Sequence, residues 1–177
     1  MKSIHSDLLK FALNFANTSR KILKNNYFKK FNVEEKNDGS LVTNIDKEIE
    51  EKFRVNLKKK FPNHGVIGEE FGNEKENNEF VWVIDPLDGT HSFIAGKPLF
   101  GTLISCTRNC KPVIGLIDIP ILNQRWFGGE KLGVKLNNEV CIKPHNKKKF
   151  NDVIMASTSL LMFNKKTRNE ITKIYEK

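Results

Sequence analysis

Two acids and a glycine–threonine pair form the most chemically suggestive segment of the sequence, Asp85-Pro86-Leu87-Asp88-Gly89-Thr90. The segment follows an apolar run at 80–84, so a buried strand is predicted to end at a charged turn. Two carboxylates three residues apart on such a turn can point into one small volume, where they repel each other unless a cation lies between them. Oxygen ligands of this kind favour magnesium, manganese or calcium. The segment therefore indicates metal-assisted phosphate chemistry, with an Asx turn carrying solvated acids as the simpler alternative.

The residues that flank the second aspartate suit a phosphate group. Gly89 permits the close approach of an anion, and the Thr90 hydroxyl can orient a water molecule. A short helix is expected to begin at 91–94, and backbone N–H groups at a helix start bind phosphate oxygens. Pro86 fixes the turn and leaves the Leu87 carbonyl as a further oxygen ligand. Metal and phosphate would then lie side by side, as metal-assisted hydrolysis requires.

Two further acidic positions lie upstream of this segment. Glu69 follows Gly68 at the end of a short predicted strand at 66–67, and Asp46 lies in the first turn of a predicted helix. A favourable charge near a helix N-terminus would also explain Asp46. A solvated loop would equally explain Glu69 and Glu70. Spacing alone leaves these alternatives open.

The elements expected to position these residues are two helices followed by a run of strands. Helices are predicted over 7–30 and 44–60, the second because apolar residues recur every four positions from Ile45 to Leu57. A turn-rich connector at 36–40 separates them, and 71–79 is predicted to be a polar loop. The predicted strands are 66–67, 80–84, 101–107, 113–118, 124–127, 134–136, 140–142 and 153–156, and a last helix is predicted over 167–177. This order predicts an α+β fold with layers around a mostly antiparallel sheet.

Length and composition narrow the class of protein. The 177 residues fit one domain that can bury a core. No apolar run approaches the roughly 18 residues of a membrane span, and the N-terminal segment does not resemble a signal peptide, so a cytoplasmic location without a membrane partner is predicted. The net charge is +9, but the lysines are spread along the sequence instead of forming a patch. Nucleic-acid binding is therefore not expected.

The ordered motifs resemble those of the inositol-monophosphatase-like family of magnesium-dependent, lithium-sensitive phosphatases. The matching elements are 41–43 with Asp46, 68–70, 82–90 and Phe93, in the family's order and at compatible spacings. The resemblance implies a layered α/β sandwich of the sugar-phosphatase type. It also implies a direct in-line attack by water, without a phosphoenzyme, and two or three Mg2+ ions in a complete chain, with Mn2+ as a substitute.

The resemblance also implies a role for each matching residue. Asp85 would bridge two metal ions, Asp46 and Thr90 would orient and activate the attacking water, and the N–H groups of Gly89 and Thr90 would hold the phosphate. Lys36 matches a basic position in a mobile loop near the site. Glu70 would support the metal ligands without binding a metal ion itself. The implied metal ligands are Glu69, Asp85, the Leu87 carbonyl and Asp88.

The segments after this core bear on the substrate, which is expected to be a small phosphorylated metabolite. Residues 96–104, 115–120 and 124–126 look more like the histidinol-phosphate phosphatase branch than the inositol branch. The inositol branch usually has Asn where Ser92 stands. The resemblance thus predicts hydrolysis of histidinol phosphate to histidinol, in histidine biosynthesis. Inositol monophosphate, or another sugar or nucleotide phosphate, is the alternative.

One departure from the family pattern concerns the C-terminal part. Family members are longer and carry a Trp-Asp motif whose aspartate completes the second metal site, whereas neither Trp82 nor Trp126 precedes an aspartate. Residues 1–177 are therefore expected to form one incomplete domain, and a homodimer is expected for the complete protein. A hypothesis from another class is an inactive, truncated basic chain that binds nucleic acid or protein. The acid set argues against it, because those carboxylates would repel a nucleic-acid backbone.

Overall fold

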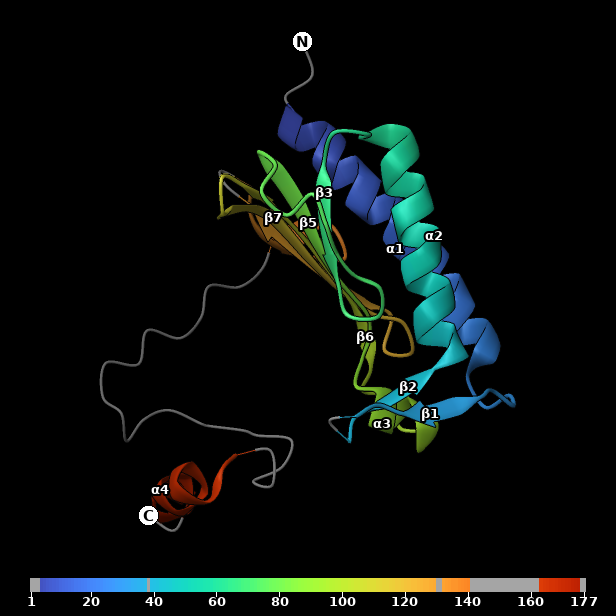
Figure 1. Ribbon diagram of the computed structural model, residues 1–177, viewed down its shortest axis with the longest axis vertical. Coiled ribbons are helices and arrows are strands. Elements are labelled where there is room, and N and C mark those ends of the chain that lie inside the picture. Colours follow the sequence, from blue (N-terminus) through green and yellow to red (C-terminus); the bar gives the residue numbers. More distant parts are fainter. Residues whose placement is uncertain (1–3, 38, 130–131, 141–162, 176–177) are drawn as a thin grey trace. The chain divides into compact units, whose positions relative to one another are not determined.

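The computed structural model describes residues 4–37, 39–129, 132–140 and 163–175 (Figure 1). The chain divides into two compact units, residues 1–141 and 142–177. The described part of the second unit contains one helix, α4 (Lys165–Tyr175), close to the helix predicted at 167–177. The strand predicted at 153–156 and most of the strand predicted at 140–142 lie outside the described residues.

Helices α1 (Ile4–Asn26) and α2 (Asn44–Lys60) cover one face of the main sheet (Figure 1). The apolar side chains that recur every four residues in α2 are buried, as predicted. α1 ends four residues before the predicted position, and Phe28, just beyond it, has the left-handed φ of 64° that cannot continue an α-helix. Among the described helices, none is both long and apolar enough to cross a membrane.

The main sheet has eight strands in the order β10-β9-β8-β7-β6-β5-β3-β4. All its neighbours are antiparallel except β3 and β5, so the predicted α+β fold with a mostly antiparallel sheet is confirmed. The strands are β3 (Gly65–Gly68), β4 (Gly72–Glu74), β5 (Phe80–Asp88), β6 (Gly101–Arg108), β7 (Lys111–Ile119), β8 (Gln124–Gly129), β9 (Gly133–Leu136) and β10 (Glu139–Val140).

Two short elements differ from the prediction. β4 occupies part of the segment predicted as a polar loop at 71–79, and it pairs antiparallel with β3. All three of its residues are exposed, so no alternation of apolar and polar side chains could reveal it. Strands β1 (Val33–Glu35) and β2 (Leu41–Thr43) form a separate two-stranded sheet around the predicted connector at 36–40.

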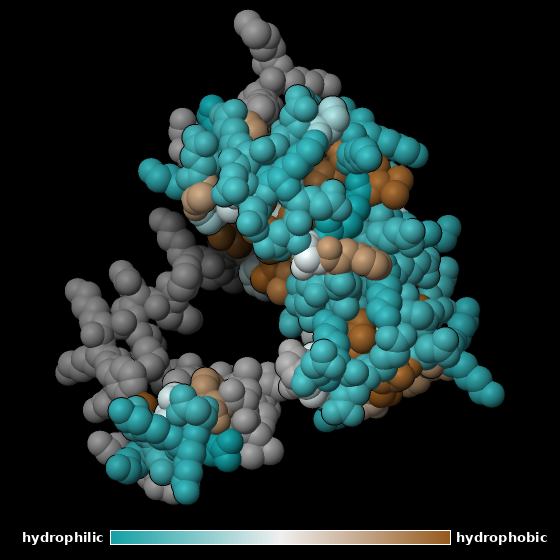
Figure 2. All heavy atoms as spheres, viewed as in Figure 1, coloured by the Kyte–Doolittle hydropathy of each residue, from teal (hydrophilic) through white to brown (hydrophobic). Residues whose placement is uncertain are grey.

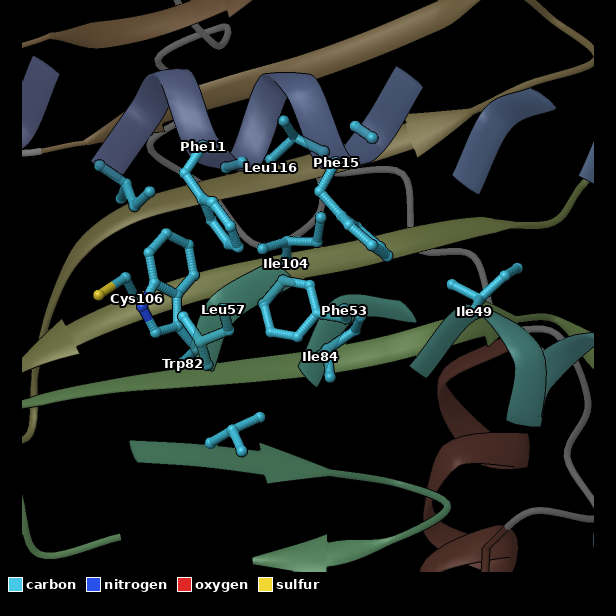
Figure 3. Close-up of a cluster of buried hydrophobic side chains, with 14 of the residues drawn as sticks. Phe11, Phe15, Ile49, Phe53, Leu57, Trp82, Ile84, Ile104, Cys106 and Leu116 are labelled. Atoms are coloured by element: carbon cyan, nitrogen blue, oxygen red, sulfur yellow. The ribbon is translucent and has the colours of Figure 1, made fainter. Parts of the chain in front are cut away.

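An aromatic core joins the helices to the sheet (Figure 3). The ring of Phe11 on α1 lies edge-on to Trp82 of β5 at 4.9 Å and to Phe53 of α2 at 5.6 Å. Trp82 and Phe53 are fully buried. Packing of this density holds α2 and β5, which both carry site residues, in a fixed relation.

The sheet face away from these helices is more exposed. Because successive strand residues point to opposite faces, Val83 lies on the other side of β5 from Trp82. Val83, Ile117 and Val134 contribute to an apolar hollow of about 480 Å³ that reaches Asp85. By contrast, hydrophilic residues cover most of the face of the molecule shown in Figure 2, with apolar residues between them.

Candidate active site

The parallel pairing of β3 and β5 brings the upstream and downstream acids together. Gly68 is paired with Ile84, so the residues that follow them, Glu69 and Asp85, lie at the same edge of the sheet. The carboxyl ends of neighbouring parallel strands are where ligands bind in many sheets, because side chains from separate segments converge there. Two of the predicted metal ligands are thus neighbours in space.

The end of β5 is a bulged strand and not the simple turn that the sequence predicts. β5 continues beyond the predicted end at residue 84 to Asp88, and its register with β6 shifts between Asp85 and Asp88. The Pro86 carbonyl accepts a hydrogen bond from the buried Thr102 hydroxyl at 2.9 Å. The Leu87 N–H donates to Asp85 Oδ1 at 3.1 Å. A bulge re-aims side chains locally, and this one lies between the two acids.

Gly89 follows the bulge with a φ of 83°. A Cβ at this position would lie 2.9 Å from the Leu99 carbonyl oxygen, so both the backbone conformation and the space require glycine. The short helix α3 (Thr90–Ile94) begins here, one residue earlier than predicted. The N–H groups of its first turn have no partner inside the helix.

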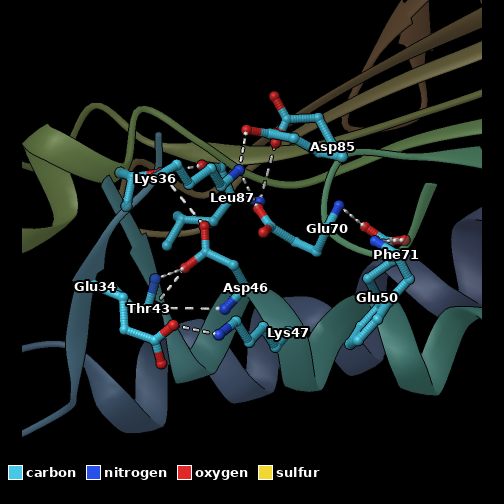
Figure 4. A network of polar contacts seen from close by, with 12 residues as sticks. Glu34, Lys36, Thr43, Asp46, Lys47, Glu50, Glu70, Phe71, Asp85 and Leu87 are labelled. Carbon is cyan, nitrogen blue, oxygen red and sulfur yellow. Dashed lines mark hydrogen bonds and ion pairs between the residues drawn. The ribbon is translucent and has the colours of Figure 1, made fainter. Parts of the chain in front are cut away.

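The position of Asp46 is compatible with both of the roles that the sequence left open, because it lies at the start of α2 and beside Thr90 (Figure 4). It completes a capping box at the start of α2, in which Asp46 Oδ2 accepts from the Thr43 N–H at 2.9 Å. Its other oxygen, Oδ1, lies 3.3 Å from the Thr90 hydroxyl, which is itself 3.0 Å from the Leu87 carbonyl oxygen. Burial raises the pKa of Asp46, although hydrogen bonds from Thr43 and Thr90 oppose the rise.

Lys36 bridges the two glutamates that follow β3. Its Nζ lies 3.1 Å from Glu69 Oε1 and 2.9 Å from Glu70 Oε1. Burial lowers the pKa of Lys36, but the hydrogen bonds and charges of Glu70 and Glu69 outweigh it and raise the pKa overall. The pKa of Glu70 is raised by burial, although Lys36 opposes the rise. The structure therefore places Lys36 and Glu70 beside the predicted ligands.

Glu50 of α2 is a supporting residue that the sequence reasoning missed. Its fully buried carboxylate accepts hydrogen bonds from the N–H groups of Glu70, at 2.7 Å, and Phe71, at 3.1 Å. Arg54 neutralises it at 2.8 Å. A Cβ on Gly68 would overlap the Glu50 carboxylate, which explains the glycine before Glu69. The available signal was spacing, because Glu50 lies four residues after Asp46 and so on the same side of the helix.

The predicted metal ligands form an open cluster of negative charge. Burial, the charges of Glu69 and Asp88, and a hydrogen bond with Glu69 raise the pKa of Asp85 to about 8. Among the described residues, no three acidic, histidine or cysteine side chains are arranged so that they could together hold a metal ion. The donor set nevertheless fits a hard divalent cation, because it consists of carboxylates and a backbone carbonyl. A cation there would relieve the repulsion that raises the pKa of Asp85.

Comparison with known proteins decides the family. Residues 5–177 match the inositol monophosphatase family. The chain belongs to this family. It is 37% identical over 164 residues to the chloroplastic bifunctional phosphatase IMPL2 of Arabidopsis thaliana, covering 92% of this chain and 47% of that protein. It is 36% identical over 131 residues to a histidinol-phosphatase of Chlorobaculum parvum, covering 73% of this chain and 50% of that protein.

A solved inositol monophosphatase from Zymomonas mobilis has the same fold. It superimposes with a TM-score of 0.82 at 32% identity, covering 98% of this chain and 66% of that chain. The chain spans about half the length of the curated relatives that it matches. Among those relatives, names of inositol monophosphatases occur more often than names of histidinol-phosphatases.

Proposed function

We propose that the complete protein containing residues 1–177 is a magnesium-dependent phosphomonoesterase. The observation that carries the proposal is the meeting of Glu69 and Asp85 at the carboxyl ends of β3 and β5, beside the Asp46–Thr90 pair. Membership of the inositol monophosphatase family supports it. The roles of individual residues rest on the resemblance and on this geometry.

The acid cluster is the proposed metal site. Mg2+, or Mn2+ in its place, would supply positive charge that polarises the phosphate ester and favours ionisation of water. Negative charge at Asp85 would be neutralised at the same time, so the carboxylates and the anionic phosphate could occupy one small volume. The proposed ligands are Glu69, Asp85, the Leu87 carbonyl and Asp88.

Asp46 and Thr90 are the proposed pair that prepares the attacking water. The Thr90 hydroxyl donates toward Asp46 Oδ1 or the Leu87 carbonyl, so its oxygen remains able to accept a hydrogen bond from water. Asp46 can take up the proton that the water loses, and burial makes it a stronger base by raising its pKa. The N–H groups of Gly89 and Thr90 are proposed to hold the phosphate oxygens, because they lie at the start of α3, where N–H groups have no partner inside the helix.

The comparisons support the alternative substrate better than the one predicted from the sequence. The sequence favours histidinol phosphate, whereas the names of the relatives give more support to an inositol monophosphatase. We therefore place inositol monophosphate, or a related sugar phosphate, before histidinol phosphate. The histidinol-phosphatase relative and the segments at 96–104 and 115–120 keep histidinol phosphate as the second candidate. A homodimer, a cytoplasmic location and a single domain stay predictions.

A phosphate-release assay on the complete gene product tests the proposal. We expect turnover that requires Mg2+ and disappears after chelation. Asp88→Asn should lower turnover by about 100-fold or more while the protein stays folded, because it removes a ligand charge. Glu51→Gln, which makes the same kind of change at an exposed site of α2, is the matched control. Undiminished turnover in Asp88→Asn would overturn the assignment of the site.

The same assay ranks the substrates. Inositol 1-phosphate and histidinol phosphate should be compared by kcat/KM under identical conditions. A higher kcat/KM for inositol 1-phosphate is the expected result. A higher value for histidinol phosphate would restore the order predicted from the sequence, and would leave the phosphatase assignment intact.

A further inference from the structure

A groove lies between α1 and α2, and none of the residues that line it has a role in the proposed function. It encloses about 570 Å³ and is lined along α1 from Asp7 to Thr18 and along α2 from Asn56 to Lys60. At 1.5 Å per residue, the α1 wall is about 16 Å long. Asp46 and Lys60 lie at opposite ends of α2, about 20 Å apart along its axis. The groove is therefore separate from the candidate active site.

The net charge of the residues that line this groove is positive. Three lysines line it, and Asp7 is the one acidic residue among its lining residues. Within the described residues, Lys10, Lys59 and Lys60 take part in no ion pair, whereas Lys36 and Lys47 are each held by glutamates. This contrast leaves three ammonium groups available to an anion.

Helix electrostatics explain these lysines only in part. Lys59 and Lys60 end α2, where positive charge complements the helix dipole. Lys10 lies in the second turn of α1, beyond the first turn in which the dipole acts, so the dipole does not explain it. A ligand shared by both helices accounts for all three positions.

The floor of the groove is apolar and fixed. The rings of Phe11 and Phe15 lie under it and are almost completely buried. Phe15 contacts Phe53 edge-on at 4.9 Å, and Phe11 contacts Phe61 at 5.5 Å, so the floor is preformed. The second of these contacts also places the end of α2 beside the start of α1.

The polar groups of the groove are unevenly distributed. The ammonium groups belong to the start of α1 and the end of α2, whereas Asn14 and Thr18 extend the α1 wall away from Lys10. Amide and hydroxyl groups suit a neutral part of a ligand that carries its own hydroxyls. Charge at one end only favours a small molecule over a nucleic-acid strand, whose charge repeats along its length.

We propose that this groove is a second binding site, for a small elongated phosphate ester of the nucleoside diphosphate type. The phosphates would contact Lys10, Lys59 and Lys60, and the nucleoside would lie toward Asn14 and Thr18 over the phenylalanine floor. The site is independent of the proposed phosphatase activity. Binding of this ligand would need no metal ion.

Calorimetric titration of the 177-residue chain with ADP, in the presence of EDTA, tests the proposal. Chelation leaves the acid cluster without a cation, so its negative charge repels the probe and only the groove is expected to bind. We expect ADP to bind, and pyrophosphate and adenosine to bind more weakly, because each lacks one half of the ligand. Amide NMR shifts should be confined to 7–18 and 56–60.

Paired variants distinguish binding in the groove from a general attraction of ADP to a positively charged protein. The double change Lys59→Gln with Lys60→Gln should weaken ADP binding by about tenfold or more, because each charged hydrogen bond contributes strongly. Lys29→Gln with Lys30→Gln removes the same charge from exposed positions outside the groove and should leave the affinity unchanged. Lys10→Gln should weaken binding from the other helix.

Four results would overturn the proposal. They are the absence of ADP binding, an equal loss in both double variants, NMR shifts at Asp46 and Asp85 instead of the groove, and binding of a single-stranded oligonucleotide without binding of ADP. Thermal melting of each variant confirms that it is folded, since all the substituted lysines are exposed.

Discussion

The buried carboxylate of Glu50 accepts a 2.7 Å hydrogen bond from the backbone N–H of Glu70. Through this bond, α2 holds the loop that follows β3 and that carries Glu69. One turn earlier on the same helix, Asp46 faces Thr90 beyond the end of β5. A single helix thus contacts both acid-bearing segments, and its packing against the sheet sets their separation.

Replacement of Glu50 by glutamine should destabilise the chain by about 2 kcal/mol, because Arg54 would lose its buried charged partner and keep only the exposed Glu74. Chemical denaturation of the 177-residue chain measures this free energy of unfolding. Glu48→Gln is the matched control, since Glu48 forms a comparable pair with Lys52 that is exposed. That change should cost less than about 1 kcal/mol. Equal costs would show that Glu50 does not support the loop.

Local patterns in the sequence were sufficient to predict α2 and the acid segment. The apolar period from Ile45 to Leu57 marks the buried face of α2, and the apolar run before Asp85 marks β5. The proline, glycine and acids after that run indicate a change in the strand, although β5 does not end there as predicted but continues with a bulge to Asp88. These features depend on neighbours in sequence, so no tertiary information was needed.

Long-range pairing explains what the sequence could not show. The register of Gly68 with Ile84 decides that Glu69 meets Asp85, and nothing in either segment specifies a parallel neighbour. Glu50 was missed because a glutamate on a helix is ordinarily solvated, and its burial depends on the N–H groups of a distant loop. β4 has no buried side chain at all.

Replacement of Gly89 by alanine should lower the free energy of unfolding more than the same change at Gly72. Both glycines have a positive φ, 83° and 70°, so both variants bear the cost of a left-handed residue, about 1–2 kcal/mol. Only at Gly89 would the new Cβ also press against the Leu99 carbonyl, since nothing lies within 4 Å at Gly72. Denaturation curves of the two variants measure the difference. Equal losses in the two variants would mean that the backbone at Gly89 moves away from the Leu99 carbonyl without a measurable loss of stability.

Stabilisation by Mg2+ should increase with pH because of Asp85. Its folded-state pKa of about 8 lies above its ordinary value of 3.8, so the folded chain holds this proton more tightly than the unfolded chain. The stabilising contribution is therefore present below about pH 4 and is lost as the pH rises through about 8, when carboxylate repulsion appears. Mg2+ competes with that proton and removes the repulsion. The rise in Tm on adding Mg2+ should be larger at pH 8.5 than at pH 6.5. At the lower pH, Mg2+ must displace the proton of Asp85 before it can bind, and this weakens its effect.

Asp85→Asn should abolish this pH dependence, whereas the exposed Glu51→Gln should preserve it. Differential scanning fluorimetry across the pH range, with and without Mg2+, provides the measurement. A Mg2+ effect on Tm that is the same at every pH in the wild-type chain would remove Asp85 from the proposed metal ligands.

Protonation of His64 should weaken the fold in mild acid. The Trp82 indole N–H donates to His64 Nδ1 at 3.0 Å, and the imidazole is stacked on Phe61 at 4.5 Å and on Phe80 at 4.9 Å. Burial lowers the pKa of His64 below its usual 6.5, although the charge of Glu79 opposes the shift. Because the folded-state pKa is depressed, the contribution of His64 to stability is present above pH 6.5 and is lost as the pH falls through the lowered value.

The physical reason is that protonated Nδ1 can no longer accept the Trp82 hydrogen bond. Denaturation followed by tryptophan fluorescence between about pH 7.5 and pH 5 measures the effect, around the ordinary titration range of histidine. The free energy of unfolding should fall more steeply in the wild-type chain than in His64→Asn, whose amide can accept the same hydrogen bond but does not titrate. Parallel pH profiles for the two chains would show that His64 does not couple protonation to folding.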